Sequence, residues 1–517
     1  MTLSMNVSVA LLSSKRIRLR FSSIVNYIAI MYRMVTAVGF TIIIARRLSI
    51  EEFGFWGVIL SLVMVFSTPV IIWSFWTQRY LSRGIKKSFG TGLFLTLIYD
   101  CVITPVFVVV GMVLGSVIIE SSVAYIILSI PYLWLNTLNA YLRSVLAVTK
   151  PEIIGYRGFV YETLRLTLAF ILVAYLKLHL MGAILTLVLA LLISNMYSLV
   201  MLRLMNVLEA RFSRDIIKEW FKGFTVPLLN IVYGSLVNGV RAFVSVVSGS
   251  SAPVAYLNVG LSAQTPIVSA STSATPALYA RILGGRGGSD VEEVLRISLL
   301  LNALLLSVFI TLSKTIASVF NPRYVDAWVV IVVLAVYAFL EGLRAILMTV
   351  ILGSAKVDID GIRSFKQLIN SGLFYAPLVR VLGLVLSYVV GGLLVITFWG
   401  DYLMQAFGIA LGLLVGVLVT MPWFIVNALR SVRFRVPLRE VCVAIISGSV
   451  VSAYLVFMRV NELVIRSFWV DAPVLAIHLL ASLAIYLSVW YALSPWFRGL
   501  TRESLRYLLK VLHIESE

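Results

Sequence analysis

Eight charged residues lie well inside segments that are otherwise apolar, and their types and positions could do chemistry. They are Arg33, Arg165, Arg241, Arg344, Arg380, Asp100, Glu162 and Glu341. An arginine near the centre of a membrane helix costs roughly 2.5–3.5 kcal/mol, so these side chains are expected to face a bundle interior or a wet cavity. Guanidinium groups there would match a phosphate or diphosphate with paired hydrogen bonds.

Two of the acids stand three residues before an arginine. Glu162 precedes Arg165 and Glu341 precedes Arg344, so each pair shares a helix face and can neutralise itself. A structural ion pair and a functional role both stay open for each. Asp100 is nearer a helix end, where capping or snorkelling is the favoured interpretation.

The other three arginines have no acid close by in the sequence, and polar side chains recur near two of them at steps of three and four. Such steps place residues on one side of a helix. Helix packing explains the small polar residues well but explains unpaired arginines poorly. The residues predicted to line a net-basic cavity and bind substrate are Arg33, Arg241, Arg380, Asn26, Asn136, Asn139, Asn238, Asn258 and Gln264.

The segments that must position these residues are membrane helices. The chain has 517 residues, is 61% hydrophobic and 13% charged, and has a mean hydropathy of +1.01. Runs of about 20 apolar residues, the length of one span, predict an all-α polytopic protein. The fourteen spans are about 21–45, 54–77, 91–117, 122–148, 154–176, 180–204, 224–247, 255–280, 296–319, 326–352, 370–398, 403–428, 440–458 and 472–495.

The positive charge follows the topology of these spans. Of the 42 Lys and Arg residues, 30 fall in alternate loops and termini on one side, 7 fall on the other side, and 5 lie within spans. This split is the positive-inside signature. It predicts that both termini are cytoplasmic, and it makes anionic lipid headgroups, not nucleic acid, the expected partners of the basic charge.

The sequence offers little support for a metal or cofactor. Cys101 and Cys442 fall in predicted spans, and the three histidines are scattered. No nucleotide-binding G-x-x-x-x-G-K-[ST] motif occurs, so direct use of ATP is not expected. An ion-driven cycle would need a group that changes charge in the membrane. The candidates are Glu341 first, then Glu162, with Asp100 beside them.

The chain divides into two similar halves. At an offset of 200, the turn around Ser49–Trp56 falls on Gly249–Tyr256; each turn follows a helix, and an aromatic residue opens the next. Six spans plus six in the same direction predict two lobes around a central cavity. The predicted parts are an N-terminal lobe (1–204), a cytoplasmic amphipathic linker (205–223), a C-terminal lobe (224–428), and two extra spans with a cytoplasmic tail (429–517).

The sequence motif between the first two spans resembles that of a known family. It reads Ala45-Arg46-Arg47-Leu48-Ser49-Ile50-Glu51-Glu52-Phe53-Gly54-Phe55-Trp56-Gly57-Val58. It is similar to that of the polysaccharide-biosynthesis flippases in the multidrug/oligosaccharidyl-lipid/polysaccharide exporter superfamily. The phrases at 248–258 and 276–281 look like the second-half counterparts. Multidrug exporters of that superfamily usually have twelve spans, and fourteen is more typical of its lipid-linked sugar flippases.

The resemblance implies a function. A flippase would move a polyprenyl- or dolichyl-(di)phosphate-linked oligosaccharide from the cytoplasmic to the outer leaflet of the cell membrane by alternating access. Its partners would be that substrate, membrane lipids, a coupling proton or sodium ion, and glycosyltransferases. The alternatives are an ion-coupled multidrug exporter of the same superfamily and a membrane polymerase or glycosyltransferase. An enzyme is disfavoured because every predicted outer loop is short and shows no carboxylate pair.

Overall fold

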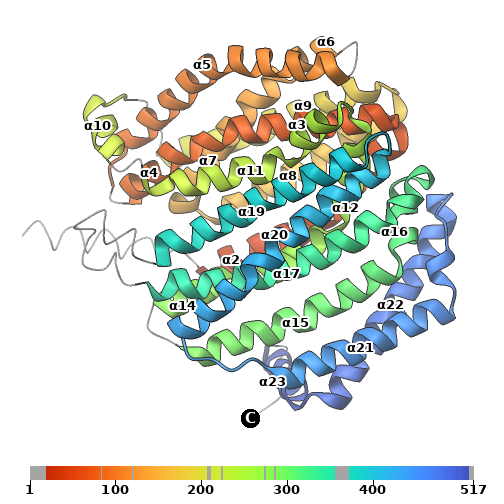
Figure 1. Cartoon of the computed structure of the whole chain (residues 1–517). Coiled ribbons are helices and arrows are strands. Elements are labelled where there is room, and N and C mark those ends of the chain that lie inside the picture. The colour runs from red at the N-terminus through yellow and green to blue at the C-terminus, as the bar shows by residue number, and fades with distance from the viewer. Residues whose placement is uncertain are drawn as a thin grey trace, which may run out of the picture. The chain divides into compact units, whose positions relative to one another are not determined.

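The computed structural model describes residues 19–82, 84–118, 122–206, 211–222, 225–272, 275–283, 287–355 and 372–511. Throughout these residues, every regular element is a helix (Figure 1). The helices form two compact units, unit 1 (Met1–Ser251) and unit 2 (Ala252–Glu517). The predicted all-α fold class is therefore confirmed.

Twelve helical stretches in the described residues are long and apolar enough to cross a membrane. They overlap twelve of the fourteen predicted spans, although the ninth, predicted at 296–319, is a helix over Gly288–Thr311 followed by a second one. The first predicted span is the single helix α2 (Leu19–Arg47), whose 29 residues rise about 44 Å, more than the thickness of a bilayer core. The chain is a multi-pass membrane protein.

The eighth predicted span is not one helix. It is divided into three short helices: α12 (Ala252–Ala263), α13 (Thr265–Thr272) and α14 (Thr275–Leu283). Pro266 and Pro276 are the second residues of α13 and α14. A proline is tolerated in the first turn of a helix, where its missing N–H has no partner to lose. The expectation of a continuous helix over 255–280 is therefore wrong.

Unit 1 contains the helices that will form the site. They are α2 (Leu19–Arg47), α3 (Ile50–Ser67), η1 (Thr68–Val70), α4 (Ile71–Ser82), α5 (Lys87–Ile118), α6 (Ser122–Leu128), α7 (Ile130–Thr149), α8 (Glu152–Ala169), η2 (Phe170–Tyr175), α9 (His179–Leu204), α10 (Arg214–Lys222) and α11 (Thr225–Ser248). The second predicted span is interrupted at Pro69, in the short turn η1 between α3 and α4. This break lies at the wall of the cavity described below.

A capping box fixes the turn between α2 and α3. The Glu52 N–H donates to Ser49 Oγ at 3.1 Å, and the Ser49 N–H donates to Glu52 Oε2 at 3.0 Å. Ser251 lies against this turn, and its hydroxyl donates to the Glu51 carbonyl at 3.0 Å. A Cβ at Gly54 would collide with the Ser251 backbone, so only glycine allows this approach. The first turn of the predicted repeat therefore contacts a residue of the second.

Unit 2 continues with longer helices. They are α15 (Gly288–Thr311), α16 (Ser313–Phe320), η3 (Pro322–Ala327), α17 (Trp328–Ser354), α19 (Gly372–Thr397), α20 (Tyr402–Ser431), α21 (Leu438–Phe457), η4 (Val460–Glu462), α22 (Phe468–Leu493) and α23 (Pro495–Val511). Helices α19 and α20 approach closely through glycines. A Cβ at Gly412 would meet the Gly391 backbone, and one at Gly416 would meet the Gly383 carbonyl. Small residues allow such backbone approach in membranes.

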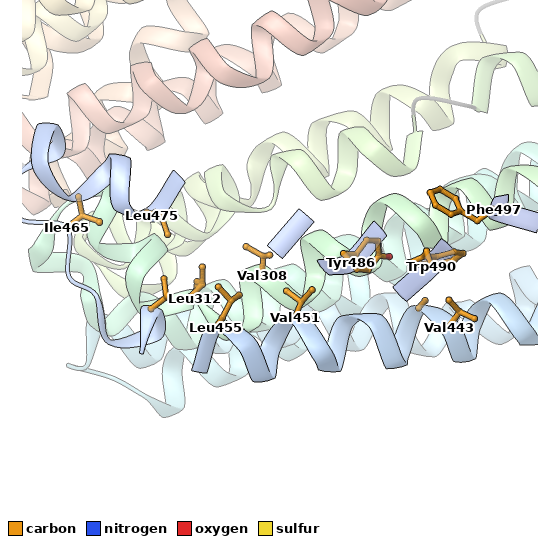
Figure 2. Close-up of a cluster of buried hydrophobic side chains, with 12 residues drawn as sticks. Val308, Leu312, Val443, Val451, Leu455, Ile465, Leu475, Tyr486, Trp490 and Phe497 are labelled. Carbon is orange, nitrogen blue, oxygen red and sulfur yellow. The ribbon is translucent and has the colours of Figure 1, made fainter. Parts of the chain in front are cut away.

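Of the last two predicted spans, α21 packs on α15 and α22 packs on α21. Val451 and Leu455 of α21 lie in one buried cluster with Val308 of α15 (Figure 2), and Trp490 of α22 is fully buried in the same cluster. The Tyr486 hydroxyl donates to the Leu300 carbonyl at 2.8 Å. These two helices therefore share a core with the ninth predicted span.

The amphipathic linker forms one short helix, α10, in its described part. Ile216 and Trp220 are buried in a cluster with Trp73 and its neighbours. The Trp220 ring contacts that of Tyr80 edge to face at 5.9 Å, and the Tyr80 hydroxyl donates to Glu219. The apolar side of α10 thus packs on protein, and its position along the membrane surface stays a prediction.

The contact boundary and the predicted lobe boundary differ by one helix. Contacts place α11 in unit 1, because it packs on α3 and the Ser61 hydroxyl donates to the Asn238 carbonyl. The repeat places the same helix at the start of the second lobe. We retain the lobes 1–204 and 224–428 as a proposal, and the site below is described within unit 1.

Candidate functional site: a basic cavity in unit 1

A cavity of about 490 Å³ opens among α2, α3, α7, α8 and α9, with Asn238 of α11 at its wall. Its charged lining consists of Arg33, Arg143, Arg157, Arg165 and Glu162. Four arginines against one carboxylate give this lining a formal net charge of +3. The predicted net-basic cavity therefore has a counterpart in this unit, and its volume falls in the range of small-molecule sites.

Glu162 stands between two arginines and a threonine. It is 2% exposed, and its Oε2 lies 2.5 Å from Arg165 Nη2 and accepts from the Thr36 hydroxyl at 3.0 Å. Its Oε1 lies 3.6 Å from Arg33 Nε. The predicted Glu162–Arg165 pair is confirmed. The expectation that Arg33 has no acid partner is wrong, because α2 packs along α8 and brings the two side chains together.

Arg33 and Arg165 nevertheless differ in their freedom. The Arg33 side chain keeps 63% of its surface exposed, whereas Arg165 keeps 12%. The Arg165 guanidinium also sits 4.8 Å from the ring centroid of Phe40 and 5.3 Å from that of Tyr161. Arg165 is therefore held by its surroundings, and Arg33 reaches into the cavity with most of its surface available.

Two further arginines line the cavity without a carboxylate. Arg157 is 4% exposed and donates to Asn139 Oδ1, and to Asn195 Oδ1 at 3.2 Å. Arg143 has neither a hydrogen bond nor an ion pair to any other residue in the described ranges. It lies close enough to Arg33 and to Arg157 for the like charges to repel. Arg143 is thus held beside two groups of like charge.

Neither Arg143 nor Arg157 is among the predicted substrate-binding residues. Their charges were counted with the cytoplasmic loop at 143–157, although they fall inside the predicted spans 122–148 and 154–176. The structure places Arg143 in α7 and Arg157 in α8, and both line the cavity. The signal that could have found Arg157 is its spacing, because Arg157, Tyr161 and Arg165 recur every four residues on one face of α8 and all line the cavity.

Neutral groups complete the wall. Asn136 donates to Ser67 Oγ at 2.9 Å, at the break between α3 and α4, and Asn139 accepts from Arg157. Asn238 lines the cavity from α11. The aromatic rings of Trp56, Tyr132 and Tyr161 also line it. Of the predicted substrate-binding residues, the structure brings together Arg33, Asn136, Asn139 and Asn238.

The other predicted residues lie elsewhere. Arg241 lies one turn beyond Asn238 on α11, is half-buried, and is not part of the cavity wall. Asn258 is buried within α12 of unit 2, and Gln264 lies in the turn after α12. The side chain of Asn26 lies outside the described residues, although its backbone belongs to α2.

Unit 2 holds a second carboxylate between two arginines. Glu341 of α17 pairs with Arg344 of its own helix, and Arg380 Nη2 of α19 lies 2.6 Å from Glu341 Oε1. The predicted Glu341–Arg344 pair is confirmed. The expectation that Arg380 is unpaired is wrong, because its acid partner comes from a different helix. Arg344 also donates to Thr420 at 3.0 Å.

Asp100 is not at a helix end. It lies well inside α5 and is 1% exposed. The capping and snorkelling interpretation is therefore wrong, since both roles need a terminal or interfacial position. Its Oδ2 is 2.9 Å from Thr137 Oγ1 on α7.

A second cavity, of about 600 Å³, lies in unit 2 between α15, α17 and α21. Its wall is mostly apolar, with Leu306, Phe339 and Ile445 among its residues, and it includes three serines. The lining of this cavity holds no charged residue.

No protein-family model and no curated protein matches this chain. Solved structures do. An inward-facing multidrug resistance MATE family transporter of the MOP superfamily matches with a TM-score of 0.60 at 14% identity, over 79% of this chain and 98% of that one. The lipid II flippase MurJ, in an inward closed conformation, matches with a TM-score of 0.61 at 13% identity, over 92% of this chain and 100% of that one.

These identities are low, so the likeness shows that the fold is shared. The two matches differ in extent. A match over 92% of the chain cannot be contained in residues 1–428, so it extends into the part of the chain that holds the last two predicted spans. The match to the MATE transporter, over 79%, does not require them.

Proposed function

We propose that this protein is a flippase for a polyprenyl- or dolichyl-(di)phosphate-linked oligosaccharide. The observation that carries the proposal is the cluster of Arg33, Arg143 and Arg157 at one cavity, with a net lining charge of +3. Like charges that repel are an unfavourable arrangement for the empty protein. Binding of a polyanion would relieve that repulsion, and guanidinium pairs match phosphate oxygens in geometry.

The three arginines would bind the phosphate in different ways. Arg33 has the most exposed surface, and its only carboxylate contact is long at 3.6 Å, so a phosphate would compete with Glu162 for it. Arg157 is fixed by two carboxamides that orient it without neutralising it. Arg143 brings a charge that has no counter-ion in the described residues. A diphosphate headgroup could meet all three.

The neutral part of the wall suits a sugar. The carboxamides of Asn136, Asn139 and Asn238 can exchange hydrogen bonds with hydroxyl groups. Trp56 and Tyr132 provide apolar ring faces beside them. A headgroup that joins phosphate to sugar would therefore find a cationic and a polar aromatic region in one cavity, while its lipid tail remains in the bilayer.

The predicted topology and the shared fold support a direction and a route. The 30 to 7 split of basic residues supports cytoplasmic termini, and transfer would run from the cytoplasmic to the outer leaflet of the cell membrane. Alternating access is the route that we infer from the fold shared with transporters. Glycosyltransferases would supply the lipid-linked glycan and use it after transfer, and a proton or sodium ion would provide the coupling.

An ion-coupled multidrug exporter is the second candidate, because a MATE transporter shares the fold with a comparable TM-score. The lining charge disfavours it, since a cationic drug would meet +3 in the wall. The match to MurJ, which extends beyond residue 428, also favours a flippase. We do not propose an enzyme.

The test is a leaflet-transfer assay. Purified protein is placed in liposomes with a fluorescent polyprenyl-diphosphate-linked disaccharide, and an impermeant quencher reports the fraction in the outer leaflet. We expect transfer by the wild-type protein and its loss in an Arg33→Gln, Arg157→Gln variant. Arg430→Gln, which changes an exposed arginine at the end of α20, is the matched control. Uptake of ethidium with no transfer of the lipid would refute the proposal in favour of the exporter.

A further inference from the structure

Asp100 is a buried acid that the cavity does not use. It is 1% exposed, and its Oδ1 has no hydrogen-bond partner in the described residues. Within those residues no lysine, arginine or histidine lies within ion-pairing distance of it. An ionised carboxylate in such a position would be strongly unfavourable, because neither a counter-charge nor a set of donors compensates for its lost hydration.

The groups around Asp100 are neutral. Helix α7 presents Thr137, whose hydroxyl meets Asp100 Oδ2, and Trp134, whose Nε1 donates to Thr104 at 2.8 Å. The neighbouring Tyr99 hydroxyl donates to the Phe66 carbonyl of α3 at 2.6 Å. Two basic residues of the adjacent helices contact other groups. Arg79 of α4 lies over the rings of Phe75 and Trp76, and Arg143 of α7 lines the cavity.

The number of hydrogens available for the contacts of Thr137 indicates the protonation state of Asp100. Thr137 Oγ1 is 2.9 Å from Asp100 Oδ2 and 2.7 Å from the Trp134 carbonyl oxygen. The hydroxyl has one hydrogen, and a carbonyl oxygen can only accept. If Thr137 donates to Trp134, the contact with Asp100 needs its hydrogen from the carboxyl group. Both contacts are two-centre hydrogen bonds at the same time only when Asp100 is a neutral carboxylic acid that donates to Thr137.

We propose that Asp100 carries the proton that is coupled to transport, and that it holds this proton in the present conformation. The coupling part rests on the proposed function, whereas the neutral state of Asp100 does not. Glu162 and Glu341 are less suited to this role. Each lies between two arginines that favour its ionised form, so gain of a proton there would leave a buried guanidinium without its charged partner.

The link between α5 and α7 connects the proton to the cavity. Thr104 donates to the Asp100 carbonyl at 2.6 Å and accepts from Trp134, so the two helices are joined at two points. Thr137 is next to Asn136, which lines the cavity. Release of the proton would leave the Asp100 carboxylate ionised and buried among neutral groups between α5 and α7. Ionised Asp100 therefore requires a conformation in which α5 and α7 separate and water enters, which would also move α7 at the cavity wall.

The variant that tests this is Asp100→Asn, because its amide can donate to Thr137 as the neutral acid does. We expect it to fold, to keep its melting temperature, and to bind inorganic pyrophosphate with unchanged affinity. In the infrared spectrum of the purified protein, the carbonyl stretch of a protonated carboxyl group should lose intensity relative to wild type. Asp215→Asn, on the exposed side of α10, should leave that band intact.

Transfer in liposomes provides the second readout. A pH gradient should change the rate of the wild-type protein several-fold, and Asp100→Asn should keep a rate that no longer responds to the gradient. Thr137→Val, which removes the hydrogen-bond partner and leaves the acid, should shift the pH at which the wild-type rate changes.

Three outcomes would overturn the proposal. They are an unchanged carboxylic-acid band in Asp100→Asn, a pH response equal to that of wild type, and transport driven by a sodium gradient alone. If the wild-type protein moves no lipid-linked sugar at all, the proposed function fails, and the infrared comparison still decides the state of Asp100.

Discussion

Replacement of Arg143 by glutamine distinguishes an effect on anion binding from an effect on protein stability more clearly than any other change in the cavity. Arg143 lines the wall, has exposed surface, and makes no hydrogen bond or ion pair to another described residue. Its neighbours Arg33 and Arg157 carry the same charge. Arg143 therefore contributes little to the stability of the folded protein, and we expect its role to be ligand binding.

The magnitudes follow from these contacts. A hydrogen bond to a charged group contributes about 1.5–3 kcal/mol, so the loss of one guanidinium from an anion site should weaken binding about 10- to 140-fold. Stability should not fall, because the change removes a repulsion and breaks no bond to another described residue. Substitutions without a lost contact usually stay within about 0.5 kcal/mol.

The assay is calorimetric titration of the purified protein with inorganic pyrophosphate, alongside its melting temperature. We expect weaker binding with an equal or higher melting temperature for Arg143→Gln, and no change in either for the control Arg430→Gln. Affinity should also decline with added salt, as charge-dominated binding does. Wild-type affinity in Arg143→Gln, or a large loss of stability, would show that Arg143 is structural and that the anion site has been misplaced.

The remaining predictions concern the ion pairs, the packing and the topology. Glu162→Gln should lower the free energy of unfolding by about 3–5 kcal/mol, because Arg165 loses a buried partner. Pyrophosphate should bind this variant more tightly, because the formal charge of the cavity lining changes from +3 to +4. Weaker binding would contradict this prediction. Gly412→Ala should destabilise the protein by about 1–3 kcal/mol through a clash with Gly391. The control Gly499→Ala should be tolerated, because open space surrounds Gly499. Equal melting temperatures of the two variants would count against the close packing of α19 and α20. Single cysteines at 84 and 434, in a protein without Cys101 and Cys442, should react with an impermeant reagent only from the cytoplasmic side, and labelling from outside would refute the predicted topology.

The sequence by itself determined the class of fold and most of its spans. Apolar segments of about 20 residues can only be accommodated by helices in a bilayer, because every backbone group must be satisfied within the helix, and twelve of the fourteen predicted spans overlap candidate spans. The pairs Glu162–Arg165 and Glu341–Arg344 were also predictable, since their geometry depends on one helix alone. The break of the eighth span was less accessible, because Pro266 and Pro276 can either kink a helix or begin one.

Only the tertiary structure decided which charges meet. Arg33 and Arg380 looked unpaired because their acid partners, Glu162 and Glu341, come from other helices. Arg157 was counted among the loop charges although a predicted span contains it, and the structure places it at the cavity. Asp100 was expected near a helix end, whereas α5 runs from Lys87 to Ile118 and its carboxyl group meets Thr137 of α7. Helical periodicity fixes which residues share a face, but the partner of that face is set by the packing of whole helices, which depends on contacts distant in the chain.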